Sequence, residues 1–498
     1  MDIKKLLLKD ILAYLDVVDT FYFNEEQRIE IKDICFDSRR VKEGSLFVCL
    51  EGNSLDGHDF AVEAVKKGAV CVVASKKIKL DKKVPLIIVK DTRKALSVVS
   101  ANFFSYPCKE LKIIGITGTK GKTSTAFMLA SILKSAGLKC GIIGTLGIFV
   151  GDEFIKTNNT TPESYCIQKY LRLMVERDVK YAIMEVSSIG LKNHRVDNIF
   201  FDSAVFTNFS FDHIGGNEHK SLEEYLESKA LLFSRCKKAF INKDDEKSSY
   251  IKEKCKCEDV KFFGINNKGI DLFAYDINFL KEEDRFFTSF FTGGIADLNV
   301  KLSSFGKFNV YNALAAILVA KDLNIDEEFI LNGLKNFSVR GRVESIDLPK
   351  KLKFKVIIDY AHTEKSLESL LSSLRECAPK RLVVVFGAGG NRSKEKRPAM
   401  GKVCGNLADF SIITADNSRF EKTLDIIRDI EKGMKKTEGK YLVIPERREA
   451  IKYALLNALE GDLIVLAGKG HETYEEINGE KIPFDERKIV KEIVNKYF

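Results

Sequence analysis

The chain has 498 residues, more than a single hydrophobic core usually supports, and at about 150 residues per domain its length predicts about three domains. Hydrophobic residues make up 45% of the chain, as is ordinary for a globular enzyme. The net charge of +9 is spread along the chain rather than gathered in a basic arm, which suits an anionic small-molecule substrate and gives no reason to expect nucleic acid as a partner.

The sequence shows no signal for secretion or membrane insertion. The N-terminal MDIKKLLLKDILAYL lacks an apolar core followed by a small-residue cleavage site, and no apolar run approaches about 18 residues. The 11 cysteines are scattered without a CxxC pair, which is typical of reduced core residues. Cys255 and Cys257 form the one close pair, and without a second cluster they predict no metal site. We therefore expect a cytoplasmic protein.

The predicted fold class is α/β, in three successive segments. Residues 1–108 carry short strand-like runs such as SLFVCL and AVCVVAS between turn signals and predict a small α/β domain. In residues 109–340, apolar strands alternate with helical patterns, which predicts a parallel sheet with crossover helices. Within this segment, Asp271 to Ser304 is rich in strand and turn residues and predicts an antiparallel addition. Residues 341–498 resume the alternation and predict a second, Rossmann-like doubly wound sheet.

The most informative stretch is KIIGITGTKGKTST, residues 112–125. Its apolar run ends at a glycine-bearing turn, after which a helical pattern begins. Gly118 and Gly121 would let the backbone approach phosphate oxygens. Lys122 would add a positive charge, and Thr123 would offer its hydroxyl to Mg²⁺. The strict eight-residue motif is not met, because Ile116 stands where its first glycine would fall, but the flanking strand and helix still predict a phosphate-binding loop.

Glu185 ends the next apolar strand, in YAIMEVSS. A buried carboxylate without a partner is costly, so we expect Glu185 to reach a metal ion bound at the neighbouring phosphate loop. Ser187, Asn193 and Arg195 follow on the loop and could bind an anionic ligand.

The strand SAVFTN continues into FSFDHIGGNEHKSLEEYLESKALLF. Asp212 and His213 lie at its end, and Ser221 with Glu224 predicts a capping box that starts a helix. Lys229 lies two turns into that helix, beside the apolar ALLF. Its position alone predicts a surface lysine whose stem packs on apolar neighbours.

Polar residues also follow four strands of the C-terminal segment, in DYAHT, FGAGGNRSKEKR, ADNSR and GKGHE. Because open parallel sheets bind ligands at the carboxyl ends of their strands, these residues predict a cleft. The six histidines show no HxH or HExxH spacing, so a histidine-ligated zinc site is not expected.

A dozen segments then match one family in order, nearly from end to end. They are DSRRVKEGSLFVCLEG, DGHDF, GTKGKTS, NTTPE, MEVSS, NFSFDH running to ESKALLF, GKFNVYNALAA, GRVE, DYAHT, GGNRSKEKRP, DNSR and GKGHE. With them the chain resembles the Mur ligase family. A dozen ordered motifs are far more specific than any one of them.

The resemblance implies a three-domain ligase of peptidoglycan precursor synthesis, cytoplasmic and monomeric. Residues 1–108 would bind the uridine end of a UDP-muramoyl-dipeptide, 109–340 would bind ATP with Mg²⁺, and 341–498 would bind the incoming amino acid. ATP would phosphorylate the D-glutamate carboxylate of UDP-N-acetylmuramoyl-L-alanyl-D-glutamate. The amine of a third amino acid would then attack the acyl phosphate, which yields an amide, ADP and phosphate.

The resemblance also implies the site residues. The catalytic set is Lys122, Glu185, His213 and Lys229. The ATP-binding set is Gly118, Thr119, Lys120, Gly121, Lys122, Thr123, Ser124, Asn309, Arg342 and Asp359. The UDP-substrate set is Ser38, Thr160, Thr161, Ser187, Asn193 and Arg195. The metal ligands are Thr123, Glu185, His213 and a carbamylated Lys229. The carbamate replaces the surface-lysine interpretation, because it turns an ammonium group into a carboxylate-like ligand.

Five further residues match the amino-acid pocket of members that add meso-diaminopimelate. They are Arg392, Asn417, Arg419, Gly468 and Glu472. Arginine pairs bidentately with a carboxylate, and Glu472 can pair with an ammonium group. L-Lysine has no distal carboxylate and would leave Arg419 unpaired. We therefore expect meso-diaminopimelate as the third amino acid, with L-lysine or another diamino acid as the alternative.

The chain departs from the family pattern at several positions. Ser418 in DNSR replaces a proline, which removes a rigid residue before Arg419. Ile189 replaces a histidine after the two serines, and HIGGNEH replaces an acidic loop. Asn193, Ser393 and Glu364 replace a glutamine, an aspartate and a proline. These changes concern the substrate more than the ATP chemistry.

Two other functions remain open from the sequence. One is a related ligase acting on another acceptor, as folylpolyglutamate synthases do, although the N-terminal DSR, DGHDF and NTTPE segments argue against it. The other is a nucleotide-binding module without catalysis, an idea prompted by Ile189 and the altered loop after His213.

Overall fold

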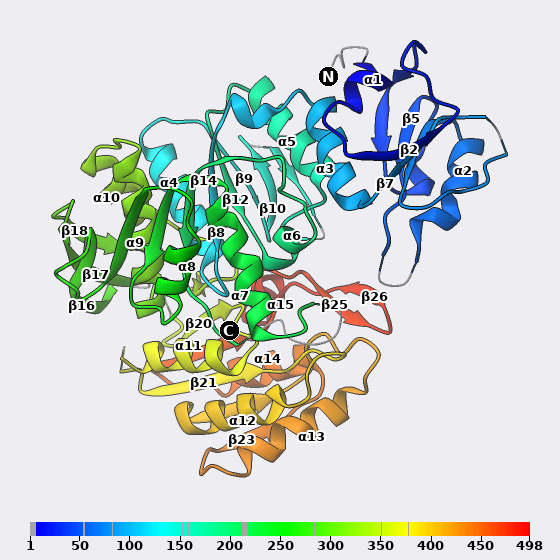
Figure 1. Cartoon of the computed structure of the whole chain (residues 1–498). Helices are drawn as coiled ribbons and strands as arrows, with labels where there is room; N and C mark the ends of the chain where they lie inside the picture. The colour runs from blue at the N-terminus through cyan, green and yellow to red at the C-terminus, as the bar shows by residue number, and fades with distance from the viewer. Residues whose placement is uncertain are drawn as a thin grey trace. The chain divides into compact units, whose positions relative to one another are not determined.

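A computed structural model gives the structure of the protein (Figure 1). The residues it describes are 6–52, 55–81, 83–151, 153–157, 159–211, 218–282, 285–349, 351–376 and 378–498. The chain forms two compact units, Met1–Ala126 with Gly137–Phe262, and Phe127–Ala136 with Phe263–Phe498. Both contain parallel sheets flanked by helices, so the α/β prediction is confirmed. The boundaries at residues 108 and 340 stay predictions.

The first unit begins with a five-stranded sheet, drawn in blue in Figure 1. Its order is β2 (Val17–Phe21), β7 (Leu86–Val89), β6 (Ala69–Ala74), β5 (Ser45–Val48) and β4 (Asp33–Cys35). The last four strands pair in parallel, and alternate apolar residues pack on α2 (Ala61–Lys66) or on α3 (Thr92–Phe103). The smaller elements are β1 (Leu6–Leu7), α1 (Leu8–Ile11), β3 (Glu30–Ile31), η1 (Ser38–Arg40), η2 (Gly57–Phe60) and η3 (Pro107–Lys109).

A second sheet carries the loop that the sequence predicts to bind phosphate. In the first unit its order is β11 (Glu153–Ile155), β10 (Gly147–Val150), β9 (Cys140–Gly144), β12 (Tyr181–Glu185), β8 (Lys112–Thr117), β13 (Phe201–Phe206), β14 (Cys236–Asn242) and β15 (Asp259–Ile265). Strands β9, β12, β8, β13 and β14 pair in parallel, so their carboxyl ends share one edge. The helices are α4 (Lys122–Ser135), α5 (Ser164–Glu176), α6 (Ser188–Lys192), α7 (Leu222–Ala230), η4 (Leu231–Ser234) and α8 (Ser248–Lys254).

Strand β15 continues into the second unit, where the predicted antiparallel addition is confirmed. There β16 (Leu272–Glu282) pairs in parallel with β15 and antiparallel with β17 (Arg285–Gly294), which pairs antiparallel with β18 (Asn299–Leu302). Helices α9 (Lys307–Asp322) and α10 (Glu327–Lys335) follow.

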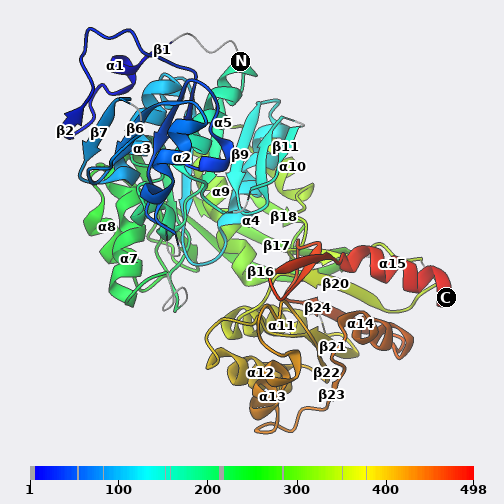
Figure 2. The ribbon, with the colours of Figure 1, turned by 90° about the vertical axis from the view of Figure 1, so that its right-hand side faces the viewer.

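The last sheet is doubly wound, as predicted. Its order is β19 (Glu344–Ser345), β20 (Lys355–Asp359), β24 (Asp462–Ala467), β21 (Arg381–Phe386), β22 (Phe410–Ile413) and β23 (Tyr441–Val443). Helices α11 (Glu364–Glu376), α12 (Lys396–Leu407) and α13 (Thr423–Met434) cover one face, and α14 (Arg447–Leu456) and α15 (Glu486–Tyr497) cover the other (Figure 2). A hairpin of β25 (Tyr474–Ile477) and β26 (Glu480–Pro483) follows β24.

Coverage of both faces explains the continuous apolar runs of these strands, such as β24, in which all six residues are buried. All ten cysteines within the described residues carry free thiols, while Cys377 lies outside that part of the chain. None of the helices in the described segments has both the length and the apolar character needed to cross a membrane.

Candidate active site

The loop after β8 is the predicted phosphate cradle, and its glycines adopt conformations that suit a tight turn. Gly118 and Gly121 adopt φ angles of 148° and 87°, which side chains other than glycine rarely allow. A Cβ on Gly118 would lie 1.9 Å from Thr207 Oγ1. Asn208 fixes Lys120, two residues further along the loop, because its Oδ1 accepts from Lys120 N (2.9 Å) and its Nδ2 donates to Lys120 O (3.0 Å). The loop is thus held open by the segment that follows the adjacent strand β13.

Two lysine side chains meet on this loop. Lys122 Nζ donates to the carbonyl oxygens of Gly118 (2.8 Å) and Thr119 (3.1 Å), and Lys229 Nζ donates to the same Gly118 oxygen (2.8 Å). Lys229 is 1% exposed, so the surface-lysine interpretation of its position was wrong. Its ammonium group also lies 4.4 Å from the ring centre of Tyr225, whose hydroxyl donates to Thr119 Oγ1 at 3.2 Å.

Glu185, at the end of β12, is fully buried and is surrounded by hydroxyl groups. Its Oε2 accepts from Thr123 Oγ1 (2.8 Å) and Thr145 Oγ1 (2.9 Å), and its Oε1 accepts from Thr145 N (3.0 Å). One threonine hydroxyl and one carboxylate beside a phosphate cradle are the oxygen ligands that Mg²⁺ prefers. These residues therefore fit a magnesium ion. Ser124, in the same first turn of α4, is buried beside Thr123.

The predicted UDP-substrate residues all lie in the first unit. Thr160 Oγ1 lies 3.0 Å from Thr145 Oγ1, and Thr161 Oγ1 donates to the carbonyl of Glu185 and accepts from Ser187 N, both at 2.9 Å. Arg195 Nη1 donates to Thr161 O at 2.9 Å. Asn193 ends α6 close by. Ser38 is the first residue of η1 and is buried.

The loop that carries His213 is only partly described. Asp212 and His213 lie outside the described residues. Half of the predicted capping box forms beyond them, since Ser221 Oγ accepts from Glu224 N at 3.2 Å. The other half does not form, because Glu224 Oε2 accepts from Lys220 N rather than from Ser221 N. His219, which was not singled out from the sequence, lies 2.8 Å through its Nε2 from Ser188 Oγ.

Three predicted ATP residues lie in the second unit. Asn309, in the first turn of α9, donates to Ser304 Oγ (2.7 Å) and Phe305 O (2.9 Å). Asp359 accepts from the backbone amides of Val343 and Ala361, both at 2.8 Å. The guanidinium of Arg342 lies 4.9 Å from the centre of the Tyr360 ring, and its buried Nε finds no hydrogen-bond partner among the described residues. An unsatisfied buried donor of this kind points to a ligand.

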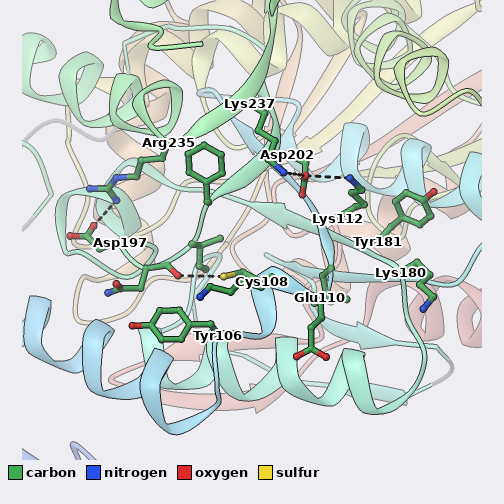
Figure 3. Close-up of a pocket in the computed structure, with 15 residues that line it drawn as sticks. Tyr106, Cys108, Glu110, Lys112, Lys180, Tyr181, Asp197, Asp202, Arg235 and Lys237 are labelled. Atoms are coloured by element: carbon green, nitrogen blue, oxygen red, sulfur yellow. Dashed lines mark hydrogen bonds and ion pairs between the residues drawn. The ribbon is translucent and has the colours of Figure 1, made fainter. Parts of the chain in front are cut away.

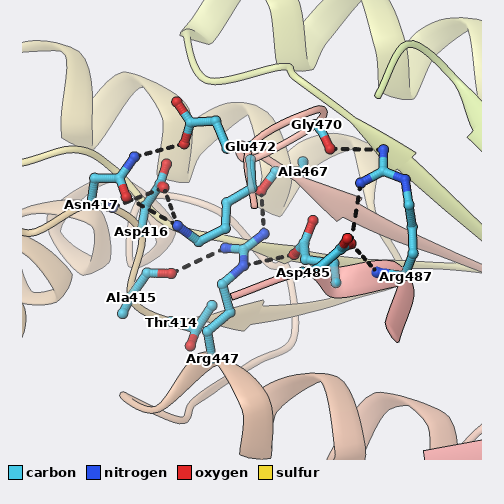
Figure 4. A network of polar contacts seen from close by, with 12 residues as sticks. Thr414, Ala415, Asp416, Asn417, Arg447, Ala467, Gly470, Glu472, Asp485 and Arg487 are labelled. Carbon is cyan, nitrogen blue, oxygen red and sulfur yellow. Dashed lines mark hydrogen bonds and ion pairs between the residues drawn. The ribbon is translucent and has the colours of Figure 1, made fainter. Parts of the chain in front are cut away.

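The predicted amino-acid residues stand at the carboxyl ends of β21, β22 and β24. Asn417 Nδ2 donates to Glu472 Oε2 at 2.8 Å (Figure 4). Arg419, in left-handed conformation with φ 50°, donates from Nη1 to Gly390 O (2.7 Å) and pairs through Nε with Glu476 Oε2 (3.2 Å). Gly468 is buried with φ 116°, and Arg392 is exposed.

A buried ion pair holds the strand ends that carry these residues. Arg447 and Glu486 are both fully buried, and Arg447 Nε donates to Glu486 Oε1 at 2.8 Å. The other two guanidinium nitrogens donate to Ala415 O (3.1 Å), two residues beyond β22, and to Ala467 O (2.8 Å), at the last residue of β24 (Figure 4). Asn417 and Gly468 therefore start from two backbone segments that one side chain ties together.

The ionisation of groups in this pocket is shifted by burial and by neighbouring charges. Burial and the nearby charge of Asp416 raise the pKa of Glu472, against the opposing effects of Asn417 and Lys469. Burial and the neighbouring guanidinium groups of Arg342 and Arg487 lower the pKa of His471 to about 3, so this histidine is neutral at pH 7.

A cavity of about 880 Å³ lies at the opposite edge of the second sheet, where β8 and β12 begin (Figure 3). Its charged side chains pair with one another: Asp202 with Lys237 (2.8 Å) and Lys112 (3.7 Å), and Asp197 with Arg235 (2.6 Å). None of the predicted site residues lines it. It is therefore separate from the candidate active site.

Three family models match the chain in order. They are "Mur ligase family, catalytic domain" over residues 30–104, "Mur ligase middle domain" over 116–320 and "Mur ligase, glutamate ligase domain" over 341–470.

Relatives match along nearly the whole chain. A UDP-N-acetylmuramoyl-L-alanyl-D-glutamate–2,6-diaminopimelate ligase of Caldanaerobacter subterraneus is 45% identical over 470 residues, which cover 94% of this chain and 95% of that protein. A solved structure of a ligase with the same name has a TM-score of 0.69 at 26% identity, with 99% of each chain covered. The MurF ligase of Thermotoga maritima in complex with ADP shares the fold, with a TM-score of 0.63 at 18% identity over 93% of this chain and 97% of that one.

Proposed function

Because this chain belongs to the Mur ligase family, we propose that it joins meso-diaminopimelate to UDP-N-acetylmuramoyl-L-alanyl-D-glutamate at the cost of ATP. The observation that carries the proposal is the meeting of Lys122, Lys229 and the Thr123–Glu185 pair around one glycine-bearing loop. The name of the relative that is 45% identical supports the choice of substrates.

The first step transfers the γ-phosphoryl group of ATP to the D-glutamate carboxylate. A carboxylate oxygen forms the new bond to phosphorus, and the bond from phosphorus to the bridging oxygen breaks to release ADP. The step brings several negative charges together, so positive charge must be placed around the phosphoryl group. Lys122 would supply one such charge, and the first turn of α4 would offer its backbone amides to the phosphates.

Thr123 and Glu185 would hold Mg²⁺, and Thr145 orients the Glu185 carboxylate through two hydrogen bonds. Bound there, the metal ion would neutralise charge that develops on the phosphate oxygens. Lys229 is proposed to act as a carbamate that, with His213, would hold a second Mg²⁺. As an ammonium group it shares one carbonyl oxygen with Lys122, and conversion to an anion would relieve the repulsion between these two like charges.

The second step forms the amide. The amine of the third amino acid attacks the acyl carbon and loses one proton to solvent, the carbon–oxygen bond to phosphate breaks, and phosphate leaves with one oxygen of the original carboxylate. We propose that Glu472 binds the distal ammonium group of meso-diaminopimelate and that Arg392 and Arg419 bind its distal carboxylate. Asn417 and Gly468 complete this pocket.

The remaining assignments are proposals on the same basis. Asn309, Arg342 and Asp359 are proposed to contact the nucleotide, and the unsatisfied Nε of Arg342 supports this role. The UDP-substrate residues Ser38, Thr160, Thr161, Ser187, Asn193 and Arg195 are proposed to contact the muramoyl-dipeptide. A monomeric state, a cytoplasmic location and the lack of a nucleic-acid partner stay predictions.

A substrate panel tests the proposed function. Phosphate release from ATP and Mg²⁺ is measured with UDP-N-acetylmuramoyl-L-alanyl-D-glutamate and, separately, meso-diaminopimelate, L-lysine, ornithine or lanthionine. We expect meso-diaminopimelate to give a far higher kcat/KM than L-lysine or ornithine, because it carries both distal charges, as lanthionine also does, and so pairs Glu472 and the two arginines. Its advantage over L-lysine is expected to be about tenfold to a hundredfold, the usual worth of charge-assisted hydrogen bonds to the distal carboxylate.

The panel also separates the alternatives. Turnover with L-lysine alone would contradict the pocket assignment while leaving the ligase chemistry intact. No turnover with any amino acid, despite ATP binding, would favour a nucleotide-binding module without catalysis. Turnover only with a folate acceptor would favour the folylpolyglutamate-synthase-like reaction.

A further inference from the structure

The side-chain amide of Asn417 is locked in one orientation. Its Oδ1 accepts from Lys469 Nζ (3.1 Å) and from the backbone amide of Glu476 (3.0 Å), and its Nδ2 donates to Glu472 Oε2 (2.8 Å). Rotating the amide by 180° would set its NH₂ group against two donors and its oxygen against a carboxylate. Lys469 and Glu476 thus make Asn417 a donor toward Glu472, as Figure 4 shows for the pair of side chains.

Lys469 itself is fully buried, which is unusual for a lysine. Besides Asn417, its ammonium group donates to Tyr474 O at 3.0 Å and lies 3.5 Å from Asp416 Oδ1. A buried cation is tolerated when it is paired and hydrogen-bonded, and both conditions hold here. Lys469 follows Gly468 in the GKGHE segment, between the two residues that the sequence assigned to the amino-acid pocket.

The charged groups around Glu472 show how the buried Lys469 affects the pKa of this carboxyl group. Asp416 raises the pKa of Glu472 beyond the effect of burial, whereas Lys469 and Arg419 lower it, and the phenols of Tyr360 and Tyr474 also face this carboxyl group. Burial alone would raise the pKa of Asp416 too, but Lys469 and Arg447 hold it below its ordinary value. In both carboxyl groups Lys469 therefore opposes the rise in pKa that burial causes.

We propose that Lys469 is a positioning residue for the incoming diamino acid, which orients the Asn417 amide and through it the Glu472 carboxylate that accepts the distal ammonium group. This inference rests on the proposed function, because it concerns the same amino-acid pocket. Lys469 does not touch the substrate in this account. It acts through Asn417 and Glu472.

The test compares Lys469→Met with Lys436→Met, which removes an exposed lysine in the turn after α13 of the same unit. In Lys469→Met the KM for meso-diaminopimelate is expected to rise about tenfold to a hundredfold, as for the loss of a charge-assisted contact. The KM values for ATP and for the UDP-dipeptide are expected to stay within about twofold of wild type. Lys469 acts on the amino-acid pocket alone, so only the binding of that substrate is weakened. Lys436→Met is expected to match wild type for all three substrates.

A pH profile distinguishes positioning from a general loss of structure. Removing a cation that lowers the pKa of Glu472 raises that pKa, so Glu472 becomes protonated at higher pH and loses its charge for the ammonium group. The acidic limb of kcat/KM for meso-diaminopimelate is therefore expected to move to higher pH in Lys469→Met and to stay in place in Lys436→Met. Lys469→Gln, which keeps a hydrogen-bond donor but no charge, is expected to show the same shift and decides the matter if Lys469→Met does not fold.

A double-mutant cycle completes the test. If Lys469 acts through Glu472, Lys469→Gln is expected to add little to the KM defect of Glu472→Gln. Equal rate losses at every pH, unchanged acidic limbs or fully additive effects would overturn the positioning role. Failure of the proposed function is distinguishable, since wild type would then turn over no meso-diaminopimelate at all.

Discussion

Replacing Lys229 by alanine is expected to lower kcat by on the order of a hundredfold to a thousandfold, because the proposed carbamate supplies a metal ligand that no other described residue replaces. The side chain is buried and lies on the Gly118 carbonyl at 2.8 Å, in the wall of the phosphate cradle. Phosphate release in the complete reaction measures the effect. Lys254→Ala, which removes an exposed lysine at the end of α8, is the matched control and is expected to behave as wild type.

Bicarbonate and short carboxylic acids separate two explanations of this loss. Bicarbonate is expected to have no effect on Lys229→Ala, since the variant has no amine to carbamylate. Acetate or propionate is expected to restore part of the activity, because either acid can bring a carboxylate into the space that the missing side chain leaves. Full activity of Lys229→Ala would show that this lysine bears no metal ligand.

Replacing Lys122 by methionine is expected to lower kcat/KM for ATP by on the order of a hundredfold to a thousandfold, the usual cost of removing one preorganised charge from a transition state. The Lys122 ammonium group donates to the carbonyl oxygens of Gly118 and Thr119, so the side chain already lies on the predicted phosphate cradle. The effect is measured by varying ATP at saturating acceptor and amino acid. Lys134→Met, in the last turn of the same helix, removes an exposed lysine and is expected to leave kcat/KM for ATP unchanged.

This variant also tests where the lysine acts. A change in KM for meso-diaminopimelate with no change for ATP would place Lys122 outside the nucleotide site. Equal losses in kcat and kcat/KM would indicate an interaction made in the transition state alone.

The strands and the glycine-bearing turn after β8 were predictable because their signals are local. Buried parallel strands such as β8 and β24 read as short apolar runs between turn residues, and polar residues directly after them fall at the edge where ligands bind. Gly118 and Gly121 stand where the backbone adopts φ angles that favour glycine. The antiparallel strands β16 to β18 were also visible, through dense aromatic and turn residues.

The contacts between segments were not predictable from local signals. Thr145 follows β9, 40 residues before the Glu185 that it orients, and nothing in its own surroundings distinguishes it from any other threonine. Lys229 looked like a surface residue because its neighbours in sequence are apolar, while its burial comes from the loop after β8. Lys469 lies inside a motif whose glycine and glutamate were recognised, yet its role depends on Asn417 from another strand end.

The altered DNSR segment is another case in which the local sequence did not determine a contact. With serine in place of proline, the sequence left the direction of Arg419 open. In the structure the residue adopts a left-handed conformation and pairs with Glu476 of the β25–β26 hairpin, which has no recognisable motif of its own. A substrate carboxylate would have to compete with Glu476 for this guanidinium group.

The central claim is that the chain moves a phosphoryl group from ATP to a carboxylate before the amide forms. The direct measurement uses UDP-N-acetylmuramoyl-L-alanyl-D-glutamate with ¹⁸O in the accepting carboxylate and follows the label by mass spectrometry of the released phosphate. The account predicts one ¹⁸O atom in each phosphate formed, and product formation that requires ATP, acceptor and amino acid together. Turnover that yields phosphate without the label would contradict it.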